Sequence, residues 1–144
     1  MPEASSEIDI DRPQSEVFGF LANAENDIKW RPGVIEIKRL SGVGVGAQFA
    51  QTVKGPGGRA IAADIAITDH QPDELIGFRA TSGPVRPVGR YLLSPVGPGT
   101  RVRFELKAEL SGLKKLIMAG AVQKTMDREM AALANLKRVL EESA

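Results

Sequence analysis

The chain has 144 residues, 42% of them hydrophobic, which predicts one globular domain over residues 1–144. It has no cysteine and a single histidine, His70, so disulfides, thiolate catalysis and a two-histidine metal site within one chain are excluded. The formal net charge is +1 and the charges are interspersed, so neither nucleic acid nor an anionic membrane is expected as a partner. No signal peptide is recognisable and no stretch approaches the roughly 18 apolar residues of a membrane span, so we expect a cytoplasmic protein.

The first predicted elements are a strand and two short helices. Residues 6–11 (SEIDID) alternate with period two, which predicts a strand. Pro13 suits the first position of a helix and apolar residues follow it at helical spacing, so residues 13–22 are predicted to be helical. Residues 24–29 are predicted to form a second helical turn, which ends before Pro32 because the residue preceding a proline disfavours helix.

The middle of the chain is predicted to form antiparallel strands, because apolar and polar side chains alternate along it. The predicted strands cover residues 34–40, 47–54, 59–69, 74–81, 85–96 and 100–110. Gly42, Gly44 and Gly46 superficially resemble a nucleotide-binding loop. A strand rather than a helix is expected after them, so we interpret them as a turn between strands.

One long helix is predicted over residues 113–141, about 42 Å in length. Its apolar face carries Ala119, Val122, Met126, Met130, Leu133 and Leu140. Such a one-sided helix must lie against another element, and the sheet is the obvious partner. A single helix cannot cover a broad sheet closely, and only 5% of the residues are aromatic, so a cavity between helix and sheet is expected.

These segments have the order and spacing of a known family. They are IDIDRPQSEVFGFLANAEN, KWRPGVIEIKRL, VGVGAQFAQTV, ITDHQPDELIGFRATSGPVRPVGRYLL and PVGPGTRVRFEL, followed by the long helix. Over nearly the whole chain they resemble the START-like superfamily (SRPBCC, or helix-grip fold), in its polyketide cyclase/dehydrase-type branch. The resemblance implies an α+β fold in which a bent antiparallel sheet of about seven strands wraps around a long C-terminal helix. Two short helices lie between the first and second strands of this fold.

The resemblance also implies a cavity that holds an apolar or amphipathic small molecule. The expected ligand-binding residues are Trp30, Ile35, Phe49, Gln51, Phe78, Tyr91, Leu93, Phe104, Val122 and Met126. Apolar walls would supply affinity, while the side chains of Gln51, Tyr91 and Trp30 would orient the ligand. Trp30, the only tryptophan, either closes the rim of the cavity or packs the corner between the short helices and the sheet. No cofactor and no metal is implied.

His70 and Tyr91 are the candidate catalytic residues. Histidine is the residue type best suited to proton transfer near neutral pH. We expect His70 to share the apolar side of Ile65 and Ile67 unless a bulge intervenes, where it would act as a general base or a polar anchor. The alternative is a strand-end histidine bonded to backbone or water.

Three functions remain open at this point, because a fold does not determine an activity. The first is binding of an apolar or amphipathic, lipid-like or polyketide-like small molecule. The second is a polyketide cyclase, aromatase or dehydratase that folds a reactive chain by confinement, assisted by His70 or Tyr91. The third is a protein-interaction module that uses the start of the last helix, residues 113–120 (LKKLIMAG). The same segment would serve as the contact of a homodimer.

Overall fold

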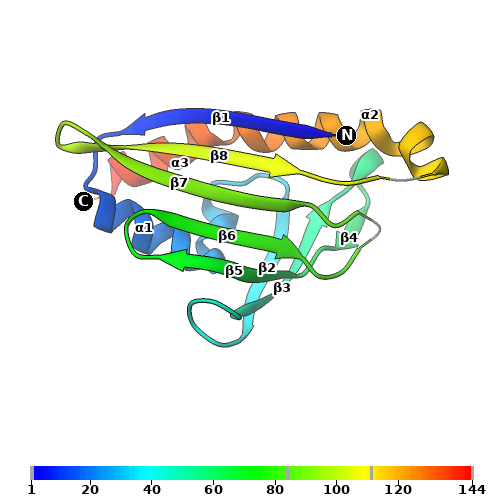
Figure 1. Cartoon of the computed structure of the whole chain (residues 1–144), viewed down its shortest axis with the longest axis horizontal. Coiled ribbons are helices and arrows are strands. Elements are labelled where there is room, and N and C mark those ends of the chain that lie inside the picture. Colours follow the sequence, from blue (N-terminus) through cyan, green and yellow to red (C-terminus); the bar gives the residue numbers. More distant parts are fainter. Residues whose placement is uncertain (1, 84, 111, 144) are drawn as a thin grey trace.

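The computed structural model describes residues 2–83, 85–110 and 112–143 (Figure 1). Its strands are β1 (Glu3–Ile10), β2 (Val34–Ser41), β3 (Gln48–Lys54), β4 (Ala60–Ala62), β5 (Ile65–Gln71), β6 (Leu75–Ala80), β7 (Val88–Val96) and β8 (Gly99–Lys107). Its helices are α1 (Gln14–Ala22), α2 (Leu113–Ala131) and α3 (Leu133–Glu142), with two 3₁₀ helices, η1 (Ala24–Lys29) and η2 (Pro56–Gly58).

The strands form one antiparallel sheet in the order β1-β8-β7-β6-β5-β3-β2, and the short β4 pairs with β3. In Figure 1, α2 and α3 run behind β1, β8 and β7, and α1 contacts β6, β7 and β8. The predicted α+β architecture is therefore confirmed: a sheet wraps around a long C-terminal helical segment, and two short helices separate the first two strands.

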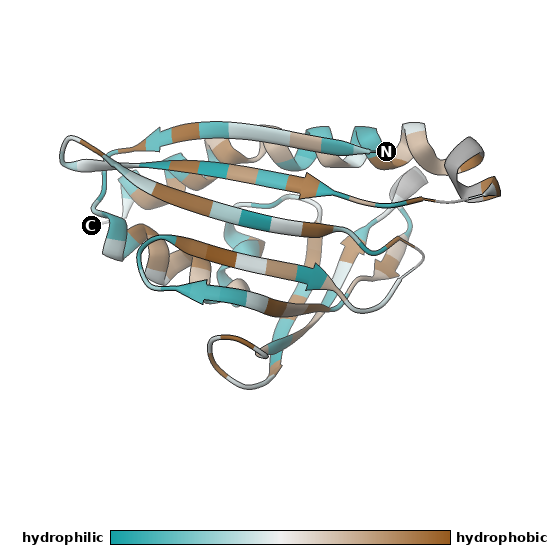
Figure 2. Cartoon of the chain, in the orientation of Figure 1, coloured by the Kyte–Doolittle hydropathy of each residue, from teal (hydrophilic) through white to brown (hydrophobic). Residues whose placement is uncertain are grey.

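The two faces of the sheet differ because side chains alternate along each strand. In β8, Val102, Phe104 and Leu106 are buried on the inner face. Arg101 and Arg103, which alternate with these residues, lie on the outer face and form ion pairs with carboxylates of β1. Figure 2 shows the alternation as brown and teal bands along β7 and β8. The inner face is thus free to enclose an apolar space while the outer face meets water.

The strand bounds differ from the predicted ones, by up to three residues at most ends, and two differences have a clear structural cause. The segment 59–69 is interrupted at Asp64 and forms β4 and β5. Asp64 Oδ1 accepts a hydrogen bond from the backbone N–H of Gln51 at 3.0 Å, and the Asp64 N–H donates to Ser82 Oγ at 2.8 Å. These side-chain bonds replace backbone bonds of a continuous strand. The first strand begins earlier than predicted, at Glu3, because it pairs with β8 over its whole length.

The predicted single C-terminal helix is interrupted at Ala132, between α2 and α3. The Ala132 N–H is shared between the carbonyls of Arg128 and Glu129, at 3.1 and 3.2 Å, and φ and ψ are −68° and −15°. This is a tight 3₁₀-like turn, so the chain continues in roughly the same direction. The Asn135 side chain donates to the Trp30 carbonyl at 3.1 Å and fastens α3 to the end of η1. Within the described ranges, no helix has the length and apolar character needed to cross a membrane.

Aromatic side chains pack together on the inner face of the sheet. Tyr91 and Phe104 lie opposite each other on β7 and β8 and stack with ring centroids 4.5 Å apart. Trp30 meets both rings edge-on, at 6.2 and 6.3 Å, and Phe78 lies 5.8 Å from Tyr91. This cluster fixes the positions of Phe78, Tyr91 and Phe104, which also border a cavity between the sheet and α2.

Candidate functional site

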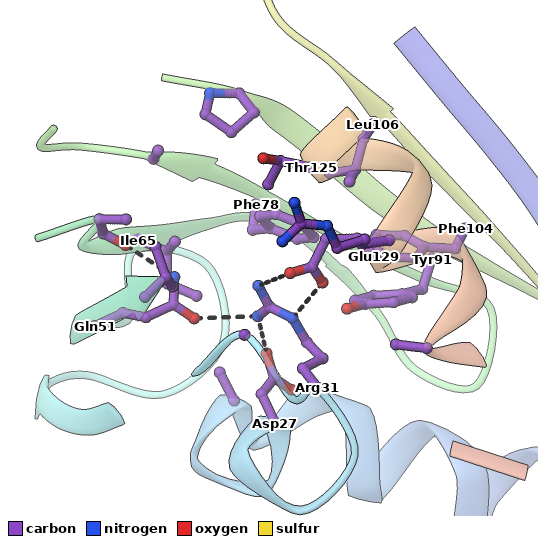
Figure 3. A pocket seen from close by; sticks show the side chains of 18 of the residues that line it. Asp27, Arg31, Gln51, Ile65, Phe78, Tyr91, Phe104, Leu106, Thr125 and Glu129 are labelled. Atoms are coloured by element: carbon purple, nitrogen blue, oxygen red, sulfur yellow. Dashed lines mark hydrogen bonds and ion pairs between the residues drawn. The ribbon is translucent and has the colours of Figure 1, made fainter. Parts of the chain in front are cut away.

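A cavity of about 340 Å³ lies between the inner face of the sheet and α2 (Figure 3). Most of its wall is apolar, and the strands that contribute to it are five neighbours in the sheet, β3, β5, β6, β7 and β8. The apolar wall includes Ile65, Ile67, Ile76, Phe78, Phe104 and Leu106. Small-molecule sites usually measure about 300–1,000 Å³, so the cavity is large enough for a compact ligand.

Four polar side chains meet in the wall of this cavity, with Arg31 at their centre (Figure 3). Arg31 Nε and Nη2 donate to the two oxygens of Glu129, at 2.7 and 3.2 Å. Arg31 Nη1 donates to Asp27 Oδ2 at 2.9 Å and to Gln51 Oε1 at 3.1 Å. We call these four residues the Arg31 cluster. They come from η1, the turn after it, β3 and α2, so the cluster joins the region of η1 to the sheet and to the C-terminal helical segment.

Local backbone structure explains why Asp27 and Arg31 meet. They are four residues apart at the end of η1, and the Arg31 N–H donates to the Asp27 carbonyl at 2.8 Å, which closes one helical turn. Pro32 then prevents the helix from continuing. Gln51 is fixed separately, because its Nε2 donates to the Ala63 carbonyl at 2.9 Å.

Burial dominates the electrostatics of the cluster. It raises the pKa of Asp27 to about 6, although the charge and the hydrogen bond of Arg31 lower it. Burial opposes the charge on Arg31, but the carboxylates of Glu129 and Asp27 raise the pKa of its guanidinium, so it remains protonated. Burial also raises the pKa of Tyr91 well above its ordinary value, and the nearby Asp27 adds to this, so the hydroxyl stays neutral.

Four of the residues predicted from the sequence to bind ligand border the cavity. They are Gln51, Phe78, Tyr91 and Phe104. In Figure 3 the Tyr91 ring lies below Glu129, with its hydroxyl directed toward the Arg31 cluster. The structure therefore brings together one amide, one phenol and two apolar rings from the predicted set.

Ile35 was predicted to line the cavity, and this is wrong. Its side chain is 43% exposed. A bulge between Val34 and Glu36 shifts the pairing of β2 with β3, so Val34 is buried in its place.

Val122 and Met126 are buried, but they do not border the cavity as predicted. The side chains of the C-terminal helical segment that do border it include Thr125, Glu129 and Ala132, which recur at helical spacing. Val122 and Met126 lie on the adjacent stripe and pack into the hydrophobic core. The apolar face of the helix was therefore identified correctly, but the cavity lies beside it.

Trp30, Phe49 and Leu93 were also predicted to line the cavity and instead lie in the packed core. They are 2%, 0% and 6% exposed and do not border the cavity. The Arg39 guanidinium lies 4.7 Å from the centroid of the Phe49 ring and covers it. The Trp30 indole N–H is buried and forms no hydrogen bond of ordinary geometry with the described residues. It lies near the Asp27 carboxyl and lowers the pKa of that group, against the larger effect of burial, which raises it. Trp30 thus packs a corner between η1 and the sheet.

His70 lies outside the cavity. Strict alternation would place Asp69, not His70, on the side of Ile67. A bulge between Ile67 and Asp69 turns His70 to the inner side, where it pairs with Ile76. The expectation that a bulge would remove it from this side is therefore wrong. Its ring packs edge-on against Phe18, 5.1 Å between centroids, at the end covered by α1.

The sequence interpretation missed Asp27, Arg31 and Glu129, because charged residues in helices and turns are usually solvated. Glu129 could have been found: it lies three residues after Met126 and four before Leu133, at the edge of the apolar stripe of the helix. Among the residues that the structure describes, no group of three or more histidine or acidic side chains could hold a metal ion.

The family described as polyketide cyclase/dehydrase and lipid transport matches this sequence over residues 1–141. The chain belongs to this family. A comparison with curated proteins finds no match.

Several solved structures share the fold. TTHA0849 of Thermus thermophilus is 20% identical, with a TM-score of 0.82, over 99% of this chain and 100% of its own. A START superfamily protein of Mycobacterium smegmatis is 16% identical, with a TM-score of 0.77, over 97% of both chains. The di-domain ARO/CYC BexL from the BE-7585A biosynthetic pathway is 15% identical, with a TM-score of 0.77, over 99% of this chain and 50% of its own. These similarities establish that this family member has the START-like fold.

Proposed function

We propose that the protein binds an apolar or amphipathic small molecule, lipid-like or polyketide-like, between the sheet and α2. The observation that carries this proposal is the cavity of about 340 Å³ with walls of isoleucine, leucine and phenylalanine. An apolar ligand that fills it gains roughly 25 cal/mol for each Å² removed from water. The Arg31 cluster and the Tyr91 hydroxyl make part of the wall polar, which suits a ligand with one polar group.

Binding can be tested with the uncharged fluorescent probe N-phenyl-1-naphthylamine, together with native mass spectrometry of the purified protein. Ala80 borders the cavity, so Ala80→Phe should fill part of it and weaken probe binding by about tenfold or more. Arg79→Phe is the matched control, because Arg79 is the neighbouring residue and points outward. Probe binding that is equally strong in both variants would place the ligand elsewhere and contradict the proposal.

A second candidate function is catalysis of a cyclisation or dehydration of a polyketide-like substrate. It is favoured by one observation: Asp27, whose pKa is about 6, borders the same cavity as the neutral hydroxyl of Tyr91. A carboxyl group that titrates near neutral pH can accept or donate a proton. Asp27→Asn should then lower turnover about a hundredfold or more while probe binding persists. His70→Gln should leave turnover unchanged, because His70 lies outside the cavity.

A further inference from the structure

We infer that the ligand presents a neutral or cationic hydrogen-bond donor, such as a phenol, an alcohol or an ammonium group, to the Arg31 cluster, and that a carboxylate at this position is rejected. This inference rests on the proposed ligand-binding function. It concerns which polar group the cavity accepts, which the apolar walls do not determine.

Arg31 is the side chain that would ordinarily bind a carboxylate, but its donors are already occupied. A guanidinium has five N–H groups. Arg31 uses four of them within the cluster, on Asp27, Gln51 and both oxygens of Glu129. A two-point contact with a ligand carboxylate would require Arg31 to leave Glu129, which is itself largely buried. The guanidinium therefore organises the cluster and has no free pair of N–H groups with which to bind an anion at two points.

The cluster has unused acceptors instead. Of the two Asp27 oxygens Arg31 donates only to Oδ2, and among the described residues each Glu129 oxygen accepts one hydrogen bond, from Arg31. A carboxylate oxygen can accept about two. All these oxygens belong to residues that border the cavity. A ligand hydroxyl or ammonium group can donate to them, and a ligand carboxylate cannot.

The charge of the cluster favours the same ligands. Two carboxylates, Asp27 and Glu129, face one guanidinium, so the cluster carries a net negative charge when Asp27 is ionised. A ligand carboxylate would lose its hydration on entering and would also be repelled at short range. A neutral donor avoids both costs, and an ammonium group is attracted.

Two basic residues also border the cavity, and both are exposed. Lys54 and Arg128 lie where the wall reaches the surface. Their charges are solvated and screened, so they contribute little to binding in the interior. They lie at the mouth of the cavity. The polar groups that a buried ligand meets are therefore those of the Arg31 cluster.

The test uses three ligands with the same naphthalene ring and a different polar group at position 2: 2-naphthol, 2-naphthylmethylammonium and 2-naphthoate. Their affinities for the full chain are measured by calorimetry at pH 7.5, where Asp27 is ionised. Naphthol and the ammonium compound should each bind with an affinity at least about ten times that of naphthoate. Equal or tighter binding of naphthoate would overturn the inference. If none of them binds and N-phenyl-1-naphthylamine does not bind either, the proposed function itself fails.

Glu129→Gln separates a direct role of the cluster from a structural one. It removes one negative charge and frees Arg31, so naphthol should bind more weakly and naphthoate more tightly. A merely structural defect would weaken both, and that result would overturn the inference. If circular dichroism shows that this variant is unfolded, Asp27→Asn should show the same opposite shifts. Glu142→Gln is the matched control, because Glu142 is exposed on α3 and does not border the cavity.

Discussion

Arg31 and Glu129 form a two-point ion pair across 98 positions of sequence, with N–O distances of 2.7 and 3.2 Å. The pair joins the turn before β2 to α2, and both residues border the cavity. Their side chains are only 12% and 16% exposed, so water replaces a lost partner poorly. The contact therefore fixes the turn before β2 against α2, and both of its residues line the cavity.

Glu129→Ala should lower the free energy of unfolding by about 3–5 kcal/mol, because it leaves the Arg31 charge buried with less compensation. Urea denaturation measures the loss. Glu142→Ala on α3 removes an exposed pair with Arg138, whose atoms are 3.8 Å apart, and should change the midpoint little. Similar losses in the two variants would mean that the Arg31–Glu129 pair has no special structural role.

Asp27 should make the fold less stable as the pH rises from about 4 to about 6. Its pKa is raised from 3.8 to about 6 in the folded chain, so the folded state binds more protons than the unfolded state in this window. Stability then falls with increasing pH, by an amount on the order of 1–3 kcal/mol. Other carboxylates, such as Glu141, have lowered pKa values and act in the opposite direction.

The contribution of Asp27 is isolated by comparing wild type with Asp27→Asn at pH 4.5 and pH 7.5. The free energy of unfolding of the variant minus that of wild type should be larger at pH 7.5 than at pH 4.5. A relative stability that does not change between the two pH values would show that Asp27 does not titrate in this window.

Gly89→Ala should destabilise the fold by about 1–3 kcal/mol, because an added methyl group overpacks the wall of the cavity. A Cβ at Gly89 would collide with the Phe78 ring and would lie 2.7 Å from Leu106 Cδ2. Thermal denaturation measures the loss. Gly19→Ala is the control: it lies in α1 with open space around it and should stabilise the helix by about 0.5–1 kcal/mol. The opposite order of stabilities would contradict the packing described for β6 and β7.

The fluorescence of Trp30 should be that of a buried indole, blue-shifted and resistant to quenching by iodide. Its side chain is 2% exposed and does not border the cavity. Ligands should change its emission only indirectly, through Tyr91 and Phe104, whose rings it contacts. Strong quenching by iodide that a ligand abolishes would instead support a position at the rim.

The fold could be predicted from the sequence because its periodic segments are clear. The alternation in residues 100–107 and the one-sided apolar face of residues 113–141 each bury one face, and few architectures accommodate both. The interruptions at Asp64 and Ala132 were missed, because each depends on hydrogen bonds that only the folded chain forms.

The cavity could be predicted only in part. Aromatic and apolar residues on the inner face were assigned by parity, which works until a bulge such as that beside Ile35 changes the register. The Arg31 cluster was missed because its members are far apart in sequence, and because each looks like an ordinary surface charge when considered alone. Burial is a property of the tertiary structure, and it changes both the pairing and the pKa of Asp27.

The alternation along β7 and β8 divides each strand between two independent tasks. Tyr91 and Phe104 face the interior, while Arg90 and Glu105, their immediate neighbours in sequence, form an ion pair of 2.6 Å on the outside. Substitutions at one set of positions leave the other set untouched. Ligand preference can therefore change, one inward residue at a time, without any change to the water-facing exterior.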